Sequence, residues 1–169
     1  MNPCPADPQD FKDALSRFPS GVTVVTLDTE DGPHAMTASA FCSLSLDPPL
    51  VLVCVKKGNR THEKLEGARG FAVNILHESQ QTHSNRFAGW PPEGEEPWDN
   101  VTHSPAEVSG APFLDGAIAS LDCTLYGTRD GGDHTIFLGQ VENTVLRGDP
   151  EDPRPLVYYR GYRGLGEKV

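Results

Sequence analysis

A cluster of cationic and short polar side chains stands where an apolar stretch gives way to a helix-like one. The cluster is Lys56, Lys57, Gly58, Asn59, Arg60 and Thr61. A helix start presents free N–H groups and a partial positive charge, so it attracts anions. The cluster therefore predicts either a phosphate site or an ordinary helix start, capped by Asn59 and flanked by solvated lysines. Neither a complete P-loop nor a G-x-G-x-x-G motif is present to decide between them.

Small residues fill the strand-like stretch from Thr37 to Ala40 (Thr37, Ala38, Ser39 and Ala40), which precedes Phe41. Such a strand buries little volume. Either another backbone approaches it closely, or a planar ligand takes the space. An isoalloxazine ring suits the second explanation, because hydroxyls and backbone N–H groups can face its polar edge while apolar groups meet the rest.

His134 follows Gly131, Gly132 and Asp133 at the tip of an expected hairpin. A histidine there can hydrogen-bond a carboxamide or phosphate, or donate a proton near neutral pH. The alternative is an exposed turn residue. The other five histidines have no ligand-like spacing with carboxylates or cysteines, so we predict no metal site.

Two further segments combine aromatic and basic residues. Arg86 and Phe87 end an expected helix, where they either approach a ligand or serve as a helix-terminal cation and a core side chain. The C-terminal tail either covers a nicotinamide or adenine ring or packs a dimer; its residues are Tyr158, Tyr159, Arg160, Tyr162 and Arg163.

The elements that must position these residues are mostly strands. Apolar and β-branched runs predict strands at 21–27, 33–41, 43–46, 50–55, 71–76, 117–126, 135–146 and 155–159. The continuous apolar run at 50–55 predicts a strand buried on both faces. Many strands and few helices predict a mainly β protein, a closed or nearly closed antiparallel barrel.

Short helices are expected at 11–18, 59–66 and 78–87. Asp10 is the expected N-cap of the first, and Gly67 the expected glycine after the second. Residues 89–100, rich in proline, glycine and acidic residues, predict a loop. We expect a flexible N-terminal arm at 1–9 and one domain at 10–169.

Length and charge limit the possible functions. The chain has 169 residues, enough for one domain with a real core, and 24 acidic against 14 basic residues give a net charge of −10. That charge argues against nucleic-acid and anionic-membrane partners. No apolar run reaches the length of a membrane span, and the N-terminus lacks signal-peptide features, so we expect a cytoplasmic protein. Cys42, Cys54 and Cys123 lie in apolar runs and are expected to be buried thiols.

Several segments, in order, resemble the flavin reductase-like family, whose fold is the FMN-binding split barrel. These segments run from Arg17 to Thr26, Met36 to Val51, Phe71 to Leu76, Gly132 to Gly139 and Pro155 to Tyr159. They cover the chain from about residue 10 to about residue 164. The T-A-S-x-F…D-P-P-L and G-D-H-x-I-F-x-G patterns are each fairly specific to this family, and together they give strong support for the resemblance.

The resemblance implies a function. The family comprises small reductases that transfer a hydride from NADH or NADPH to FMN or FAD and supply reduced flavin to a partner monooxygenase. It implies a homodimer with flavin near the subunit interface. Thr37 to Ala40 and the backbone of Cys54, Val55, Lys56 and Lys57 would hold the ring and ribityl chain. Asn59, where the family often has serine, and Thr61 would meet the phosphate. Arg86 and Phe87 would approach the flavin, His134 the nicotinamide.

Two other functions remain open at this stage. One is a split-barrel protein that binds flavin or haem without catalysis, although the intact Gly132-Asp133-His134 segment speaks against it. The other is an oxidase of the pyridoxine-phosphate oxidase type, which would need a richer basic pocket than Lys56, Lys57 and Arg60 provide. A purely structural module explains neither the small-residue strand nor the polar helix start.

Overall fold

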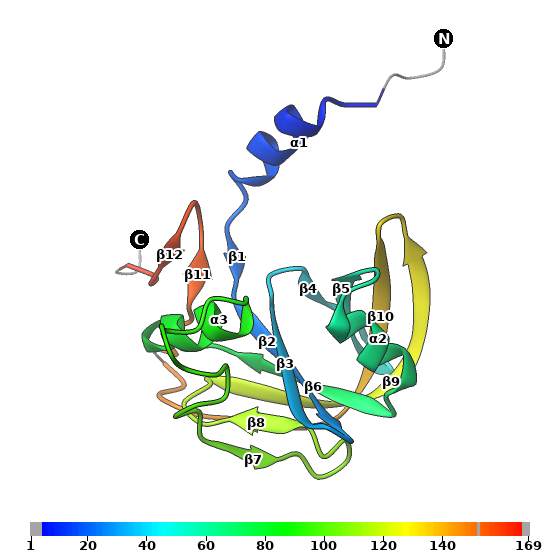
Figure 1. The fold of residues 1–169 in the computed structure, drawn as a ribbon, viewed down its shortest axis with the longest axis vertical. Helices are drawn as coiled ribbons and strands as arrows, with labels where there is room; N and C mark the ends of the chain where they lie inside the picture. Colours follow the sequence, from blue (N-terminus) through cyan, green and yellow to red (C-terminus); the bar gives the residue numbers. More distant parts are fainter. Residues whose placement is uncertain (1–4, 152, 167–169) are drawn as a thin grey trace.

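The computed structural model describes residues 5–151 and 153–166, and its centre is a seven-stranded antiparallel sheet (Figure 1). The strand order is β3-β2-β6-β9-β10-β5-β4. The strands are β2 (Thr23–Thr29), β3 (Gly32–Ala38), β4 (Phe41–Leu46), β5 (Pro49–Lys56), β6 (Gly70–Ile75), β9 (Ala119–Gly131) and β10 (His134–Leu146).

The sheet curls without closing. β3 and β4 stand at its opposite ends, yet only Ser39 and Ala40 separate them in the chain. The sheet must therefore bend until its two edges converge at this short link, and Figure 1 shows β3 leading into β4 there. Shifts of register along β9–β10, next to Gly139 and Asn143, bend the longest hairpin. The predicted antiparallel split barrel is confirmed.

Two small sheets flank the barrel. One joins β1 (Ser20–Gly21), β11 (Val157–Tyr158) and β12 (Tyr162–Arg163), and the other joins β7 (His103–Pro105) to β8 (Pro112–Leu114). The strand predicted at 155–159 is thus only two residues long, preceded by a single bridge between His77 and Pro155. β1, β7, β8 and β12 were not predicted as separate strands, because strands of two or three residues have no readable periodicity.

The helices are short: α1 (Pro8–Leu15), α2 (Arg60–Gly67), the 3₁₀ turn η1 (Glu78–Gln80) and α3 (Gln81–Phe87). The prediction of Asp10 as N-cap was wrong. Asp7 caps α1, accepting from Gln9 N at 2.8 Å, because Pro8 suits the first helical position. Gly67 is likewise the last residue of α2, and Ala68 is its C-cap.

Helix α1 stands off the body of the molecule (Figure 1). None of its residues is buried, and the apolar face formed by Phe11 and Leu15, continued by Phe18, is exposed. The helix therefore draws no stability from packing against the barrel within one chain, although an isolated helix this short is marginal in water.

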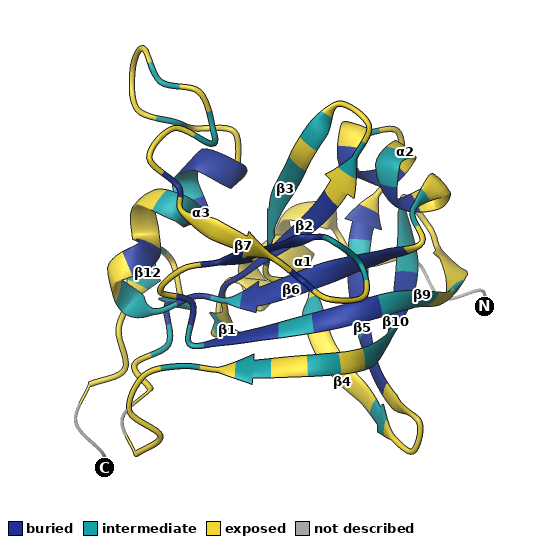
Figure 2. Cartoon of the chain, turned by 90° about the horizontal axis from the view of Figure 1, so that it is seen from below, coloured by how far each residue is buried: buried dark blue, intermediate teal, exposed yellow. Residues whose placement is uncertain are grey.

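The main core lies inside the curled sheet. It joins apolar side chains from β2, β5, β6, β9 and β10, among them Phe71 and Phe137, and Figure 2 shows the buried residues concentrated along these strands. Strand β5 alternates: Val51, Val53 and Val55 face the core, whereas Leu52 and Cys54 are only half-buried. The prediction that both faces of this strand are covered was wrong for a single chain.

Leu52 and Cys54 belong to a partly exposed apolar surface that we call the outer face. By strand register it also includes Cys42 of β4 and Ile136 and Leu138 of β10. Cys42 is exposed, so the prediction of a buried thiol there was wrong: it lies on the outward side of an edge strand. Cys123, in contrast, is buried, and burial raises its pKa to about 12.

Candidate functional site

The small-residue segment and the end of β5 meet directly. The backbone N–H of Cys54 donates to the carbonyl of Ala40 at 3.0 Å. This contact places the β3–β4 link beside the strand that leads into the basic turn. Two segments predicted to share one ligand therefore adjoin, although the thirteen residues 41–53 lie between them in the chain.

Side chains alternate along the link. Ala38 is buried in the main core, while Thr37 and Ser39 line a cavity of about 200 Å³. We call this cavity the aromatic pocket; it is lined by Val22, Thr37, Ser39, Ser84, Trp90, Tyr158 and Tyr162. The small residues thus leave space at Thr37 and Ser39, whereas the close approach of another backbone is found at Ala40, which accepts from Cys54 N.

Hydroxyl groups fix one wall of the aromatic pocket. Thr37 Oγ1 donates to the Ser84 carbonyl at 2.7 Å, and Ser84 Oγ lies 2.9 Å from the Tyr162 hydroxyl. The rings of Tyr158 and Tyr162 meet edge to face, with centroids 5.6 Å apart. β3, α3 and the β11–β12 hairpin are therefore joined at the pocket. Tyr162 lies within it, as the ring-covering alternative for the tail requires.

The basic turn begins α2 as expected. Asn59 is the N-cap, and its Oδ1 accepts from the backbone N–H of His62 at 2.7 Å. Gly58 has a φ of +75°, which a side chain would strain. Lys57 turns away from the helix start, pairing with Asp130 and donating from Nζ to the Gly132 carbonyl at 2.6 Å. This pair also lowers the pKa of Asp130, mainly through the hydrogen bond.

Thr61 is buried near the start of α2, and its hydroxyl oxygen has a partner on β3. Oγ1 lies 2.8 Å from Nε2 of His34 on β3. Burial lowers the pKa of His34, and the charges of Lys64 and Arg60 lower it further. His34 is therefore neutral at pH 7. Its Nε2 can either donate a hydrogen bond to the threonine oxygen or accept one from the threonine hydroxyl.

His134 opens β10, directly opposite Lys56 in the register of β5. Opposed residues on antiparallel strands project from the same face, so the imidazole and the Lys56 ammonium share one side of the sheet. Nδ1 of His134 lies 2.8 Å from Oδ1 of Asp133, an interaction that lowers the pKa of Asp133. The carboxylate orients the ring, and the side chain is 40% exposed.

Arg86 and Phe87 are not among the residues that line the aromatic pocket. Arg86 is buried, pairs with Glu95 and donates from Nη1 to the Glu96 carbonyl at 3.0 Å. Phe87 packs on Trp98, with ring centroids 4.7 Å apart. Both residues thus anchor the loop at 89–100. Phe87 is a core side chain, as one of the two alternatives predicted, whereas the buried ion pair of Arg86 was not predicted. Their direct contact with flavin stays a prediction, as does that of the other site residues.

Sequence reasoning missed four residues of this region: Val22, Ser84, Trp90 and His34. Ser84 and His34 carry no local signal, since their roles depend on partners in distant elements. Trp90 did carry a local signal. It directly precedes Pro91 and Pro92, and a residue before proline has a restricted backbone conformation.

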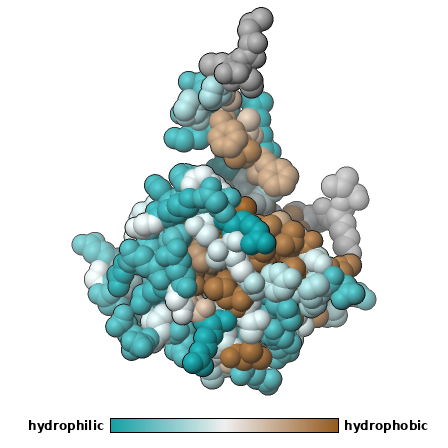
Figure 3. Space-filling view, turned by 90° about the vertical axis from the view of Figure 1, so that its right-hand side faces the viewer, coloured by the Kyte–Doolittle hydropathy of each residue, from teal (hydrophilic) through white to brown (hydrophobic). Residues whose placement is uncertain are grey.

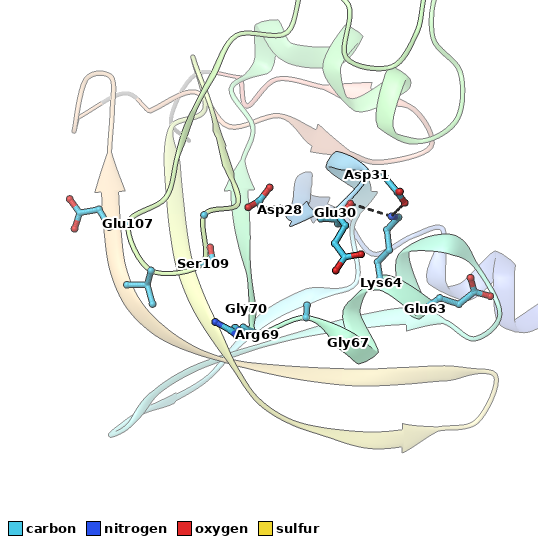
Figure 4. A pocket seen from close by; sticks show the side chains of 14 residues that line it. Asp28, Glu30, Asp31, Glu63, Lys64, Gly67, Arg69, Gly70, Glu107 and Ser109 are labelled. Carbon is cyan, nitrogen blue, oxygen red and sulfur yellow. Dashed lines mark hydrogen bonds and ion pairs between the residues drawn. The ribbon is translucent and has the colours of Figure 1, made fainter.

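A second cavity, of about 720 Å³, lies elsewhere on the barrel (Figure 4). Its lining includes five carboxylate residues, Asp28, Glu30, Asp31, Glu63 and Glu107. Lys64 reaches Asp31 across it, with Nζ 3.1 Å from Oδ2. This carboxylate-rich cavity repels phosphate and contains none of the predicted site residues.

In residues 5–151 and 153–166, no cluster of three histidine, cysteine or acidic side chains could hold a metal ion. Within the same ranges, no helix combines the length and the apolar character needed to cross a membrane.

The family model described as "Flavin reductase like domain" matches residues 15–166. The chain belongs to the flavin reductase-like family. Its matched range spans the barrel, the β11–β12 hairpin and every predicted site residue. The family resemblance inferred from the sequence is therefore confirmed.

Named relatives support this family assignment. The reductase component of 4-hydroxyphenylacetate 3-monooxygenase from Thermus thermophilus is 44% identical over 156 residues, covering 92% of this chain and 95% of the relative. The NADH-dependent FAD reductase of Streptomyces globisporus is 42% identical over 151 residues, covering 83% and 82%.

Solved structures agree as well. The NADH:FAD oxidoreductase of Streptomyces globisporus, in complex with NAD and FAD fragments, superposes with a TM-score of 0.84 at 35% identity. The match covers 97% of this chain and 98% of that one. The predicted class of enzyme, a flavin reductase, is confirmed by these names.

Proposed function

We propose that this chain oxidises NADH or NADPH, reduces FMN or FAD, and passes the reduced flavin to a separate monooxygenase. One observation carries the proposal: the hydrogen bond from Cys54 N to Ala40 O joins the small-residue link to the strand entering the basic turn. A ring at the link and a phosphate at the turn then lie within one continuous surface.

The donor chemistry of this surface fits a phosphorylated flavin. The first N–H groups of α2 have no partner within the helix, and Gly58 leaves the backbone open. Lys56 and Arg60 are exposed cations with no ion-pair partner in the described ranges, whereas Lys57 is paired. Lys56, Arg60 and the helix start are the groups that bind the phosphate, in a chain that is acidic elsewhere.

The cofactors supply the hydride chemistry when bound, and the protein supplies orientation and electrostatics. Thr37 and Ser39 present hydroxyls at the link. His134, steered by Asp133, orients the carboxamide of the nicotinamide. Val55, whose side chain is fully buried, contributes only backbone, and Cys54 is half-buried beside it. No side-chain nucleophile is needed for this reaction.

The partner monooxygenase is inferred from named relatives. The HsaB protein of Mycobacterium tuberculosis, 38% identical over 160 residues, is named the reductase subunit of a flavin-dependent monooxygenase. A trigonelline monooxygenase reductase component from Acinetobacter baylyi is 39% identical over 154 residues. A reductase of this kind must release its product, so flavin binding here is reversible.

We assign the outer face to a homodimer interface. Cys42, Leu52, Cys54, Ile136 and Leu138 form an apolar stripe in which Cys42 is exposed and the other four are half-buried, and Leu44 is a further exposed residue of β4. Figure 3 shows apolar surface gathered on this side of the molecule. Contiguous apolar surface of this kind is typical of an interface, and the projecting α1 would find its packing partner in the second copy.

Light scattering coupled to size exclusion tests the dimer. We expect about twice the 18.3 kDa chain mass for wild type, and a monomer for Leu52→Glu. Val108→Glu, an exposed apolar position away from the outer face, is the matched control and should stay dimeric. A monomeric wild type at micromolar concentration would refute the assignment.

The cytoplasm is the location we propose. The described cysteines Cys42, Cys54 and Cys123 are all free thiols, as is usual in a reducing compartment. Detection of the tagged full-length protein in the membrane or secreted fraction would contradict this location.

A grid of steady-state assays tests the activity. NADH and NADPH are each combined with FMN, FAD and riboflavin, and oxidation is followed at 340 nm. We expect flavin-dependent turnover, faster with FMN or FAD than with riboflavin because of the phosphate site. Flavin binding without NAD(P)H oxidation would instead identify a non-catalytic binding protein.

A further inference from the structure

The aromatic pocket differs chemically from the basic turn. None of its seven lining side chains carries a charge, and it offers three aromatic rings together with hydroxyls from threonine, serine and tyrosine. Its volume of about 200 Å³ is below the roughly 300–1,000 Å³ of pockets that enclose whole drug-sized ligands. It therefore suits one neutral ring system with a hydrogen-bonding edge, and neither a phosphate nor an entire dinucleotide.

Trp90 is the most exposed of the three aromatic residues in this lining. Its side chain is 71% exposed, whereas Ser84 and Val22 are buried and Tyr162 is held by its hydroxyl contact to Ser84. An indole left in water at the rim of a pocket offers a ring face to anything that enters. The floor and inner wall of the pocket are fixed, and Trp90 supplies the outer side.

The backbone on both sides of Trp90 is anchored to α3. Its own N–H donates to the Asn85 carbonyl at 2.9 Å. Further along the loop, Arg86 holds Glu95 and the Glu96 carbonyl, and Trp98 packs between Phe87 and His103. The loop at 89–100 is thus clamped near both ends, which keeps the indole at the rim of the pocket.

We propose that Trp90 is a specificity-determining residue for the reductant: a neutral ring of NAD(P)H, nicotinamide or adenine, binds in the aromatic pocket against the indole face. The Arg86–Glu95 pair acts as a positioning element for it. This inference rests on the proposed reductase function. It also gives the hydroxyl groups of Thr37, Ser84 and Tyr162 a role, since these groups meet the polar edge of the ring.

Kinetics of Trp90→Ala and Trp90→Phe test the proposal. Loss of one stacking surface should raise KM for NADH roughly tenfold or more, with kcat at saturating NADH within about twofold of wild type and FMN affinity unchanged. Phenylalanine should restore most of the affinity, because it keeps a ring face. Tyr126→Ala, which removes an exposed aromatic residue outside the pocket, is the control and should match wild type.

Fluorescence identifies the ring. The chain has two tryptophans, so Trp98→Phe leaves Trp90 as the reporter. Quenching on titration with AMP assigns the pocket to adenine, and quenching with nicotinamide mononucleotide assigns it to nicotinamide; either result supports the proposal.

Three outcomes are unambiguous failures. An active wild type whose KM for NADH is unchanged by Trp90→Ala overturns the inference and leaves the reductase function intact. A loss of FMN affinity instead of NADH affinity also overturns it, since the pocket would then hold flavin. A wild type that is inactive with every flavin refutes the proposed reductase function itself. Fluorescence quenching by AMP or nicotinamide mononucleotide would then still show, independently of activity, whether the pocket binds a ring.

Discussion

Oγ1 of Thr61 lies 2.8 Å from Nε2 of His34, so a residue of β3 controls a hydroxyl at the start of α2. If Nε2 carries the proton, the imidazole donates to the threonine oxygen and leaves the threonine O–H free to donate to an anion. The tautomer of His34 therefore determines whether the Thr61 hydroxyl can donate to a phosphate. This role cannot be predicted from residues 59–61 alone.

The first prediction concerns this hydroxyl. Thr61→Val should weaken FMN binding roughly tenfold or more, since a hydrogen bond to a charged group is lost. Riboflavin, which lacks the phosphate, should bind both proteins equally. Isothermal titration with the two flavins measures the difference. Thr135→Val, which removes a threonine bonded to His62 instead, is the control. Equal losses for FMN and riboflavin would show that Thr61 does not serve the phosphate.

The second prediction concerns pH. Burial first, and neighbouring cations second, lower the pKa of both His34 and His83 from the ordinary value of 6.5. The unfolded chain then binds protons at these histidines more readily than the folded chain does. Their contribution to the free energy of unfolding is therefore fully present above about pH 6.5 and is lost as the pH falls below it. Urea unfolding at pH 7.5 and 5.5 should show this loss, and His34→Gln should reduce it. An unchanged pH dependence in the variant would exclude His34 as a source.

The third prediction concerns His134. His134→Ala should lower kcat/KM for NADH about tenfold, because orientation of the carboxamide is lost, while the Kd for FMN stays the same. Asp133→Asn keeps an acceptor for the imidazole and should cost less than Asp133→Ala. Stopped-flow reduction and flavin titration separate the two effects. Unaltered reduction kinetics and NADH affinity in His134→Ala would remove this residue from the mechanism.

Local patterns predicted the barrel well. The β-branched run of β2, the apolar run of β5 and the glycines of the β9–β10 tip each carry their own signal, and Asn59 capped α2 as expected. In these segments, local propensity and tertiary packing favour the same structure, so a single sequence is sufficient.

Long-range contacts were not predictable in the same way. Cys42 was expected to be buried because its neighbours are apolar, but burial depends on which side of an edge strand a residue takes. The ion pair of Arg86 with Glu95 and its hydrogen bond to the Glu96 carbonyl were not predicted, because these partners lie in an irregular loop whose path no periodicity indicates. Ser84 meets Tyr162 from 78 residues away.

The fourth prediction explains the glycine that ends the G-D-H-x-I-F-x-G pattern. A Cβ on Gly139 would lie 2.6 Å from Phe71 Cζ and 3.0 Å from Cys123 Cβ, inside the main core. Gly139→Ala should therefore destabilise the fold by about 1–3 kcal/mol through overpacking. Gly127→Ala, on the neighbouring strand, meets nothing within 4 Å and is the matched control. Urea unfolding compares the two, and equal stabilities would refute the packing explanation.

The fifth prediction concerns the two ends of the Arg86–Glu95 pair, whose side chains are 7% and 35% exposed. Arg86→Met removes the buried charge and keeps much of the packing, and water can solvate the remaining carboxylate. Glu95→Gln leaves a buried guanidinium without its counter-charge, which costs more. We expect Glu95→Gln to lower stability by about 1–3 kcal/mol, and Arg86→Met by less. Glu93→Gln, an exposed residue of the same loop, should change little. Chemical unfolding of the three variants decides the order, and a reversed order would mean that lost packing at Arg86 outweighs the buried charge.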